Sequence, residues 1–197
     1  MLEINNISNI TNPYSRIKLD YEDGELLKVK LVWDSCANLD LCAFFLAKDG
    51  TVGGVFPSDY KNRREASGSL NTFPYMLYIE ECDYYDEDID TNQDQIWITN
   101  LFQIDKVCFI AIDYDAAINE IDAKFSEDKA KLLINNELKT IFQTELYSSS
   151  KGCVYSIYST VNETDGLYIC NHNDNLVMDL ATAFGLIPGF STICNYY

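Results

Sequence analysis

The residues of this 197-residue chain that could do chemistry are most concentrated in a run of carboxylates over residues 80–94, EECDYYDEDIDTNQD. The run holds eight Asp and Glu side chains and no Lys or Arg. Carboxylates crowded into one folded loop repel one another, so they need either open solvent or a cation. Calcium binds about six to eight oxygens from Asp, Glu, carbonyl groups and water. The run is therefore either a calcium-binding loop or a solvated acidic loop.

An EF-hand is the first calcium site to test against these residues. If the loop starts at Asp86, then Asp88 and Asp90 fall at its third and fifth positions. However, Thr91 stands where the loop needs Gly, and Trp97 stands where it needs a bidentate Glu. The flanking residues also follow a strand pattern instead of a helical one. Any calcium site here would belong to loops of a β-scaffold.

A second group of short oxygen-bearing side chains, Asp34, Asn38 and Asp40, lies between two strand-like runs. By themselves, Asp and Asn are common turn residues because they hydrogen-bond to their own backbone. Together with the acidic run, they become candidate cation ligands.

The elements that must hold these loops are mostly strands. Alternating or continuous apolar residues predict strands at 26–33, 39–47, 51–56, 76–79, 95–100, 107–112, 138–146, 153–160 and 167–170. Residues 115–133 fit a helix by propensity, and residues 176–187 show helical spacing before Pro188. We predict a mainly β protein, an antiparallel β-sandwich of two sheets with one or two short helices, including a C-terminal one. Residues 1–24 are predicted to be a polar lead-in, and residues 25–197 a single domain.

Composition excludes several classes of function. A net charge of -17 and a pI near 4.2 argue against nucleic-acid binding through phosphate contacts. No apolar run is long enough to span a membrane, and the first residues lack a secretory pattern, so we expect a cytoplasmic protein. The seven cysteines form no C-x-x-C pair and are expected to be reduced.

Catalytic motifs are scarce. His172 is the only histidine, and the sequence has no phosphate-binding glycine loop and no nucleophile elbow. Asp88 and Asp90 offer the carboxylate pair that a hydrolase or glycosidase needs, but a highly charged loop is a poor place to raise one carboxyl pKa. We therefore expect a protein that is not an enzyme. A small hydrolase or glycosidase is the alternative, and an adaptor without metal is a third.

Four stretches of the chain resemble the TerD family of tellurium-resistance and stress-response proteins. They are LKVKLVWD at 27–34, NLDLCAFFLAKDG at 38–50, DYYDEDIDTNQDQIWI at 83–98 and ITNLFQIDKVCFIAI at 98–112. The resemblance covers roughly residues 26–147. It implies a calcium-binding β-sandwich of two sheets, with a strand in place of the helix at 130–134.

The resemblance also implies the metal ligands. In that family, a strand ending in Trp-Asp precedes a D-x-D segment, and a Gly-Asp-Asn loop with further acids follows later. Carried over to this sequence, the ligand set is Asp34, Asn38, Asp40, Asp83, Asp88, Asp90 and Asp94. The sequence departs from the family at Asn38, which replaces an Asp, and at Cys82 and Tyr84, which replace the Gly and Asn. Other loop glycines are replaced by Glu87, Ile89 and Thr91, which restrict the backbone.

The function implied is calcium binding in a stress or tellurite-resistance response, without catalysis. The expected partners are calcium ions and other stress-response proteins, with the cytoplasmic face of the membrane as one place of action. We expect no nucleic-acid partner and no transmembrane segment.

Overall fold

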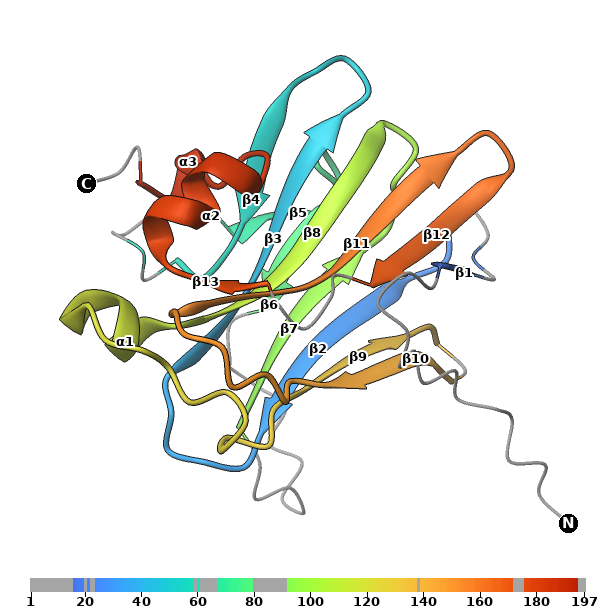
Figure 1. Ribbon diagram of the computed structural model, residues 1–197. Coiled ribbons are helices and arrows are strands. Elements are labelled where there is room, and N and C mark those ends of the chain that lie inside the picture. Colours follow the sequence, from blue (N-terminus) through green and yellow to red (C-terminus); the bar gives the residue numbers. More distant parts are fainter. Residues whose placement is uncertain are drawn as a thin grey trace, which may run out of the picture.

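Two antiparallel sheets stack face to face in the computed structural model of the protein (Figure 1). The structure describes residues 16–19, 21, 24–58, 60, 67–79, 92–137, 139–171 and 176–194. The predicted antiparallel β-sandwich is confirmed.

Seven strands form the first sheet. In spatial order they are β1 (Arg16–Lys18), β12 (Gly166–Asn171), β11 (Val154–Glu163), β8 (Ile104–Asp113), β3 (Leu39–Ala47) and β4 (Val52–Val55), and β13 (Val177–Met178) pairs with β11. The second sheet has six strands. Their order is β10 (Thr140–Glu145), β9 (Lys131–Asn135), β2 (Leu27–Trp33), β7 (Asn92–Ile98), β6 (Met76–Ile79) and β5 (Gly68–Ser69). Hairpins and longer connections join them, and every pairing within the two sheets is antiparallel.

The main core fills the space between the sheets. In β2, every second residue from Leu27 to Trp33 is buried in this core, while Lys28 and Lys30 alternate with them. The facing side chains of β3 and β8, including Leu41 and Phe109, close the core from the other sheet. The period of two that predicts a half-buried strand therefore matches the side chains that meet between the sheets.

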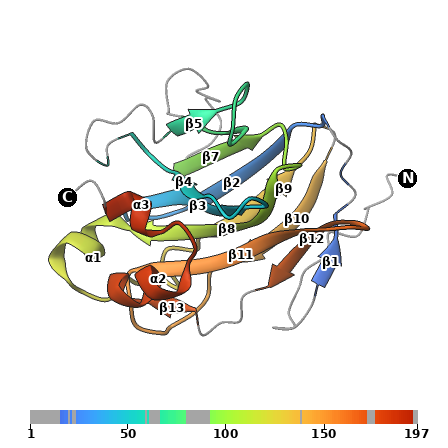
Figure 2. The ribbon, with the colours of Figure 1, turned by 90° about the horizontal axis from the view of Figure 1, so that it is seen from above.

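A second apolar layer covers the outer face of the seven-stranded sheet. Helices α2 (Leu180–Leu186) and α3 (Ser191–Cys194) lie against this sheet, α2 near β11 and α3 near β3 and β4 (Figure 2), and Phe190 packs on Phe44 with ring centroids 5.0 Å apart. Because β8 faces the main core on one side and this layer on the other, both of its faces are buried. This explains why residues 107–112 are continuously apolar.

The predicted elements are present, with one correction. Each predicted strand has a counterpart, and the C-terminal helix is confirmed as α2. The helix expected over residues 115–133 is wrong beyond its first turns, because α1 (Tyr114–Asn119) ends at Glu120, which adopts a left-handed conformation with φ 55°. The strand that the family resemblance implied at 130–134 is found as β9. None of the helices in the described residues is long and apolar enough to cross a membrane.

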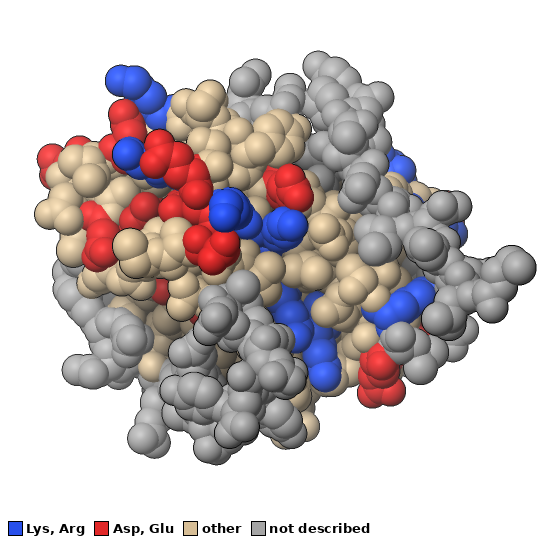
Figure 3. Space-filling view, turned by 90° about the horizontal axis from the view of Figure 1, so that it is seen from below, with Lys and Arg blue, Asp and Glu red and all other residues tan. Residues whose placement is uncertain are grey.

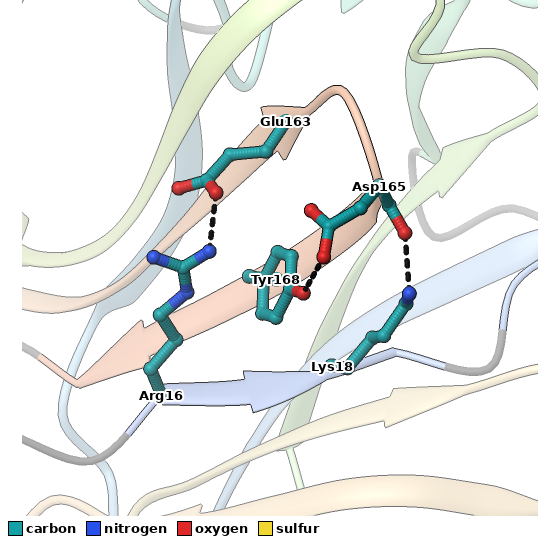
Figure 4. Close-up of polar contacts among 5 residues, drawn as sticks. All are labelled: Arg16, Lys18, Glu163, Asp165 and Tyr168. Carbon is teal, nitrogen blue, oxygen red and sulfur yellow. Dashed lines mark hydrogen bonds and ion pairs between the residues drawn. The ribbon is translucent and has the colours of Figure 1, made fainter.

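The described end of the lead-in belongs to the sheet. Strand β1 pairs with β12, and contacts of its charged side chains with residues of β11 and β12 and of the turn between them stabilise this position (Figure 4). Arg16 forms an ion pair with Glu163, and its guanidinium lies 3.9 Å from the ring centroid of Tyr168. Lys18 donates to the backbone carbonyl of Asp165. Charged and aromatic side chains hold this strand, which is why hydrophobic patterning did not predict it.

Candidate functional site

The pairing of β2 with β7 brings the two acidic regions of the sequence together. The register places Trp33, the last residue of β2, opposite Asn92, the first residue of β7. The Asn92 side-chain amide donates to the backbone carbonyl of Ser35 at 2.7 Å. The loop at 34–38 therefore lies beside the end of the acidic run. The expected ligands Asp83, Asp88 and Asp90 lie outside the described residues.

Two expected ligands, Asp34 and Asn38, are exposed in the loop between β2 and β3. The Asp34 carboxylate forms an ion pair with Lys129, at 3.0 Å between Oδ2 and Nζ. Its backbone N–H donates to the carbonyl of Asp128 at 3.2 Å. The backbone carbonyl of Asn38 accepts from the N–H of Tyr114 at 2.9 Å, which fixes this end of the loop against α1.

Asp40 lies on β3, two residues beyond the loop, and is half-buried. Its Oδ2 accepts a hydrogen bond from the Tyr60 hydroxyl at 2.7 Å. Tyr60 in turn packs edge-on against Tyr114, with ring centroids 5.6 Å apart. The carboxylate is thus held at the end of the sheet where α1 begins.

Asp94 lies on β7 with its side chain directed between the sheets, and it is 9% exposed. Its Oδ2 accepts a hydrogen bond from the backbone N–H of Leu41 at 2.8 Å, across from one sheet to the other. Tyr78 is hydrogen-bonded to the same carboxylate, and burial together with Asp94 raises the pKa of the Tyr78 hydroxyl. Burial, reinforced by Asp40 and Asp94, raises the pKa of the Cys42 thiol. Asp94 therefore links the sheets, and its role as a metal ligand remains a prediction.

One acidic residue of the site, Asp128, was not among the predicted ligands. It is 7% exposed, and its Oδ2 has no hydrogen-bond partner within the described structure. Burial raises the pKa of the Asp128 carboxyl, a hydrogen bond with the Ser35 side chain opposes this, and the charge of Asp113 adds to it. The sequence around Asp128 carries no signal for this position, because the residues that surround it come from distant parts of the chain.

The donor chemistry of the site suits a hard cation such as calcium. Asp34, Asp40 and Asp128 supply carboxylate oxygens, and the space-filling view shows acidic side chains gathered at the end of the molecule where α1 lies in Figure 1 (Figure 3). Among the described residues, however, no three His, Cys, Asp or Glu side chains lie close enough together to hold a metal. Calcium binding at this end of the molecule therefore stays a prediction.

The residues on which the hydrolase alternative depends, Asp88 and Asp90, lie outside the described structure, and so does His172. The five cysteines with described side chains, at positions 36, 42, 108, 153 and 170, are free.

Comparison with solved structures shows what the fold is similar to. A homologue of the telluride resistance protein TerD from Streptomyces coelicolor A3(2) matches with a TM-score of 0.52 and 10% identity, over 75% of this chain and 87% of that one. A protein of unknown function matches with a TM-score of 0.48 and 13% identity, over 82% of this chain and 95% of that one. No family model and no curated protein matches the sequence. The chain has a TerD-like fold.

Proposed function

We propose that this protein binds calcium through the loop at 34–38 and the acidic run at 80–94, and that it is not an enzyme. The observation that supports the proposal is the contact between Asn92 and Ser35, because Asn92 belongs to the acidic run and Ser35 to the loop at 34–38. Asp34, Asn38, Asp40 and Asp94 from the described residues, with Asp83, Asp88 and Asp90 from the acidic run, are the proposed ligands. We also assign the protein to a stress or tellurite-resistance response in the cytoplasm, where it acts through partner proteins.

The proposal has a thermodynamic consequence. Two loops about fifty residues apart would share bound ions, so the free energy of binding becomes free energy of folding. At free calcium a hundredfold above the dissociation constant, one site adds about 2.7 kcal/mol to the free energy of unfolding. In a domain of this size that gain raises the melting temperature by roughly 5 to 10 °C.

A thermal melt with and without calcium tests the proposal. Asp40→Asn and Asp83→Asn should stabilise the calcium-free protein slightly, because they relieve repulsion, and should remove most of the gain from calcium. Asp105→Asn is a matched control, since Asp105 is an exposed acid near the start of β8 and outside the proposed ligand set. It should leave the calcium response unchanged.

The same melts separate the proposal from its alternatives. Turnover of chromogenic glycosides or esters without calcium stabilisation would favour a hydrolase. Neither turnover nor stabilisation would favour an adaptor without metal. If Asp83→Asn blunts the response while Asp34→Asn and Asp40→Asn preserve it, the loop at 34–38 is only a turn and the two-loop site is wrong.

A further inference from the structure

The turn at residues 125–129 packs against the loop at 34–38 and brings two groups of opposite charge to it. The Asp34 N–H donates to the Asp128 carbonyl, which fixes the turn to the loop. Lys129 adopts a left-handed conformation with φ 52°, and its ammonium reaches the Asp34 carboxylate at 3.0 Å. The turn thus presents an ammonium to a predicted calcium ligand.

Asp128 brings a buried carboxylate to the same place. Asp128 is 7% exposed, and its Oδ2 has no hydrogen-bond partner in the described residues. The negative charge of Asp113 acts on Asp128, and one oxygen of Asp113 accepts from the Ala116 N–H and caps α1. Buried carboxylate oxygens are normally paired with a donor or a cation. A positive ligand would satisfy this oxygen and reduce the repulsion between the two acids.

We propose that the turn at 125–129 is part of the cation site, with Asp128 as an additional ligand and Lys129 as an internal cation that calcium must displace from Asp34. This inference rests on the proposed calcium binding and names two residues that regulate its affinity. Lys129 and Asp34 are 70% and 60% exposed at their side chains, so the ion pair is weak and can open. Calcium carries twice the charge of the ammonium and accepts several oxygens, which lets it replace Lys129 when it binds.

Competition between Lys129 and calcium predicts whether each substitution raises or lowers the calcium affinity. An exposed ion pair of this kind is closed about one to five times as often as it is open, so Lys129→Gln should tighten calcium binding about two- to sixfold. Asp128→Asn removes one negative charge and should weaken binding about tenfold. Lys151→Gln removes another exposed positive charge, but Lys151 pairs with Asp122 at 3.7 Å and not with Asp34. This control should change the affinity less than twofold.

The experiment is an isothermal calorimetric titration of calcium into the full chain and into the three variants. Far-ultraviolet circular dichroism of each variant confirms that it is folded. A fourth variant, Asp34→Asn combined with Lys129→Gln, should show no gain over Asp34→Asn alone, because Lys129 then has no carboxylate to block.

Each outcome decides between the two proposals. Tighter binding by Lys129→Gln and weaker binding by Asp128→Asn support the inference. Calcium binding that neither substitution alters, or an equal gain for Lys151→Gln, overturns it while calcium binding stands. If the Lys129→Gln variant binds calcium and the unaltered chain does not, the inference is supported, because Lys129 then blocks the site in the unaltered chain. The absence of binding in every protein, including Lys129→Gln, overturns both.

Discussion

The hydrogen bond between Asp94 and Leu41 makes a prediction that separates a structural role from metal binding. Strand β4 pairs with residues 43–46 of β3 and does not reach Leu41. The Leu41 N–H instead donates to the Asp94 carboxylate on the other sheet. Substituting Asp94 removes a buried, charge-assisted hydrogen bond and leaves a backbone donor unpaired between the sheets.

The size of the effect follows from these two losses. A hydrogen bond to a charged group contributes about 1.5–3 kcal/mol, and an orphaned buried donor costs about 1–3 kcal/mol. Part of this is offset because the carboxylate itself no longer has to be buried. We expect Asp94→Ala to lower the free energy of unfolding by about 3 kcal/mol, which is roughly 6 to 12 °C in melting temperature. Asp94→Asn keeps an acceptor for Leu41 and should cost about 1 kcal/mol.

Urea unfolding in the presence of a chelator measures these differences without any contribution from calcium. If Asp94 were only a metal ligand, both substitutions would stabilise the chelated protein by relieving repulsion with neighbouring acids. A higher urea midpoint for Asp94→Asn and Asp94→Ala than for the unaltered chain would therefore refute the structural role. Asp105→Asn again provides the matched control.

Two further predictions follow from buried titratable groups. Among the five described cysteines, the exposed Cys36 should react first with a thiol-alkylating reagent in the folded protein. Cys42, whose pKa is raised by burial, should react only after unfolding, and peptide mass mapping checks the order. Asp128→Asn should stabilise the chelated protein at neutral pH. The gain in stability should be smaller at a pH below 3.8, the ordinary pKa of an Asp carboxyl. The sign follows because the folded carboxyl has the higher pKa, so the unfolded chain ionises first and folding loses free energy as the pH rises. A benefit that is constant with pH, measured from melts between pH 3 and 7, would show that Asp128 is not desolvated.

The local sequence predicted the strands in which the pattern of apolar residues matches the faces that are buried. The continuous apolar residues of β8 and the alternation in β2 reflect which faces are buried. The prediction of a long helix was wrong because Ile118 and Ile121, whose spacing in the sequence fits one apolar helix face, are 55% and 60% exposed. Glu120, in a left-handed conformation, ends α1 after Asn119, so the helix does not extend through the rest of the predicted range.

The arrangement of the site depends on pairings between distant residues, which local patterns do not contain. Asp34 and Asp40 were recognised as candidates from their residue types and from family resemblance. The hydrogen bond that occupies Asp94 comes from a residue 53 positions away, and the ion pair between Asp34 and Lys129 spans 95 positions. Asp128 has no local signal, because its burial results from the packing of one turn against another loop.

Metal content tests the central claim most directly. The chain is purified without chelator, dialysed against buffer with a low concentration of calcium, and analysed by inductively coupled plasma mass spectrometry together with the dialysis buffer. Calcium binding through the two acidic loops predicts at least about one calcium ion per chain above the buffer, with less in a variant that carries Asp83→Asn and Asp88→Asn. Calcium in the protein sample equal to that in the buffer would contradict the proposed function.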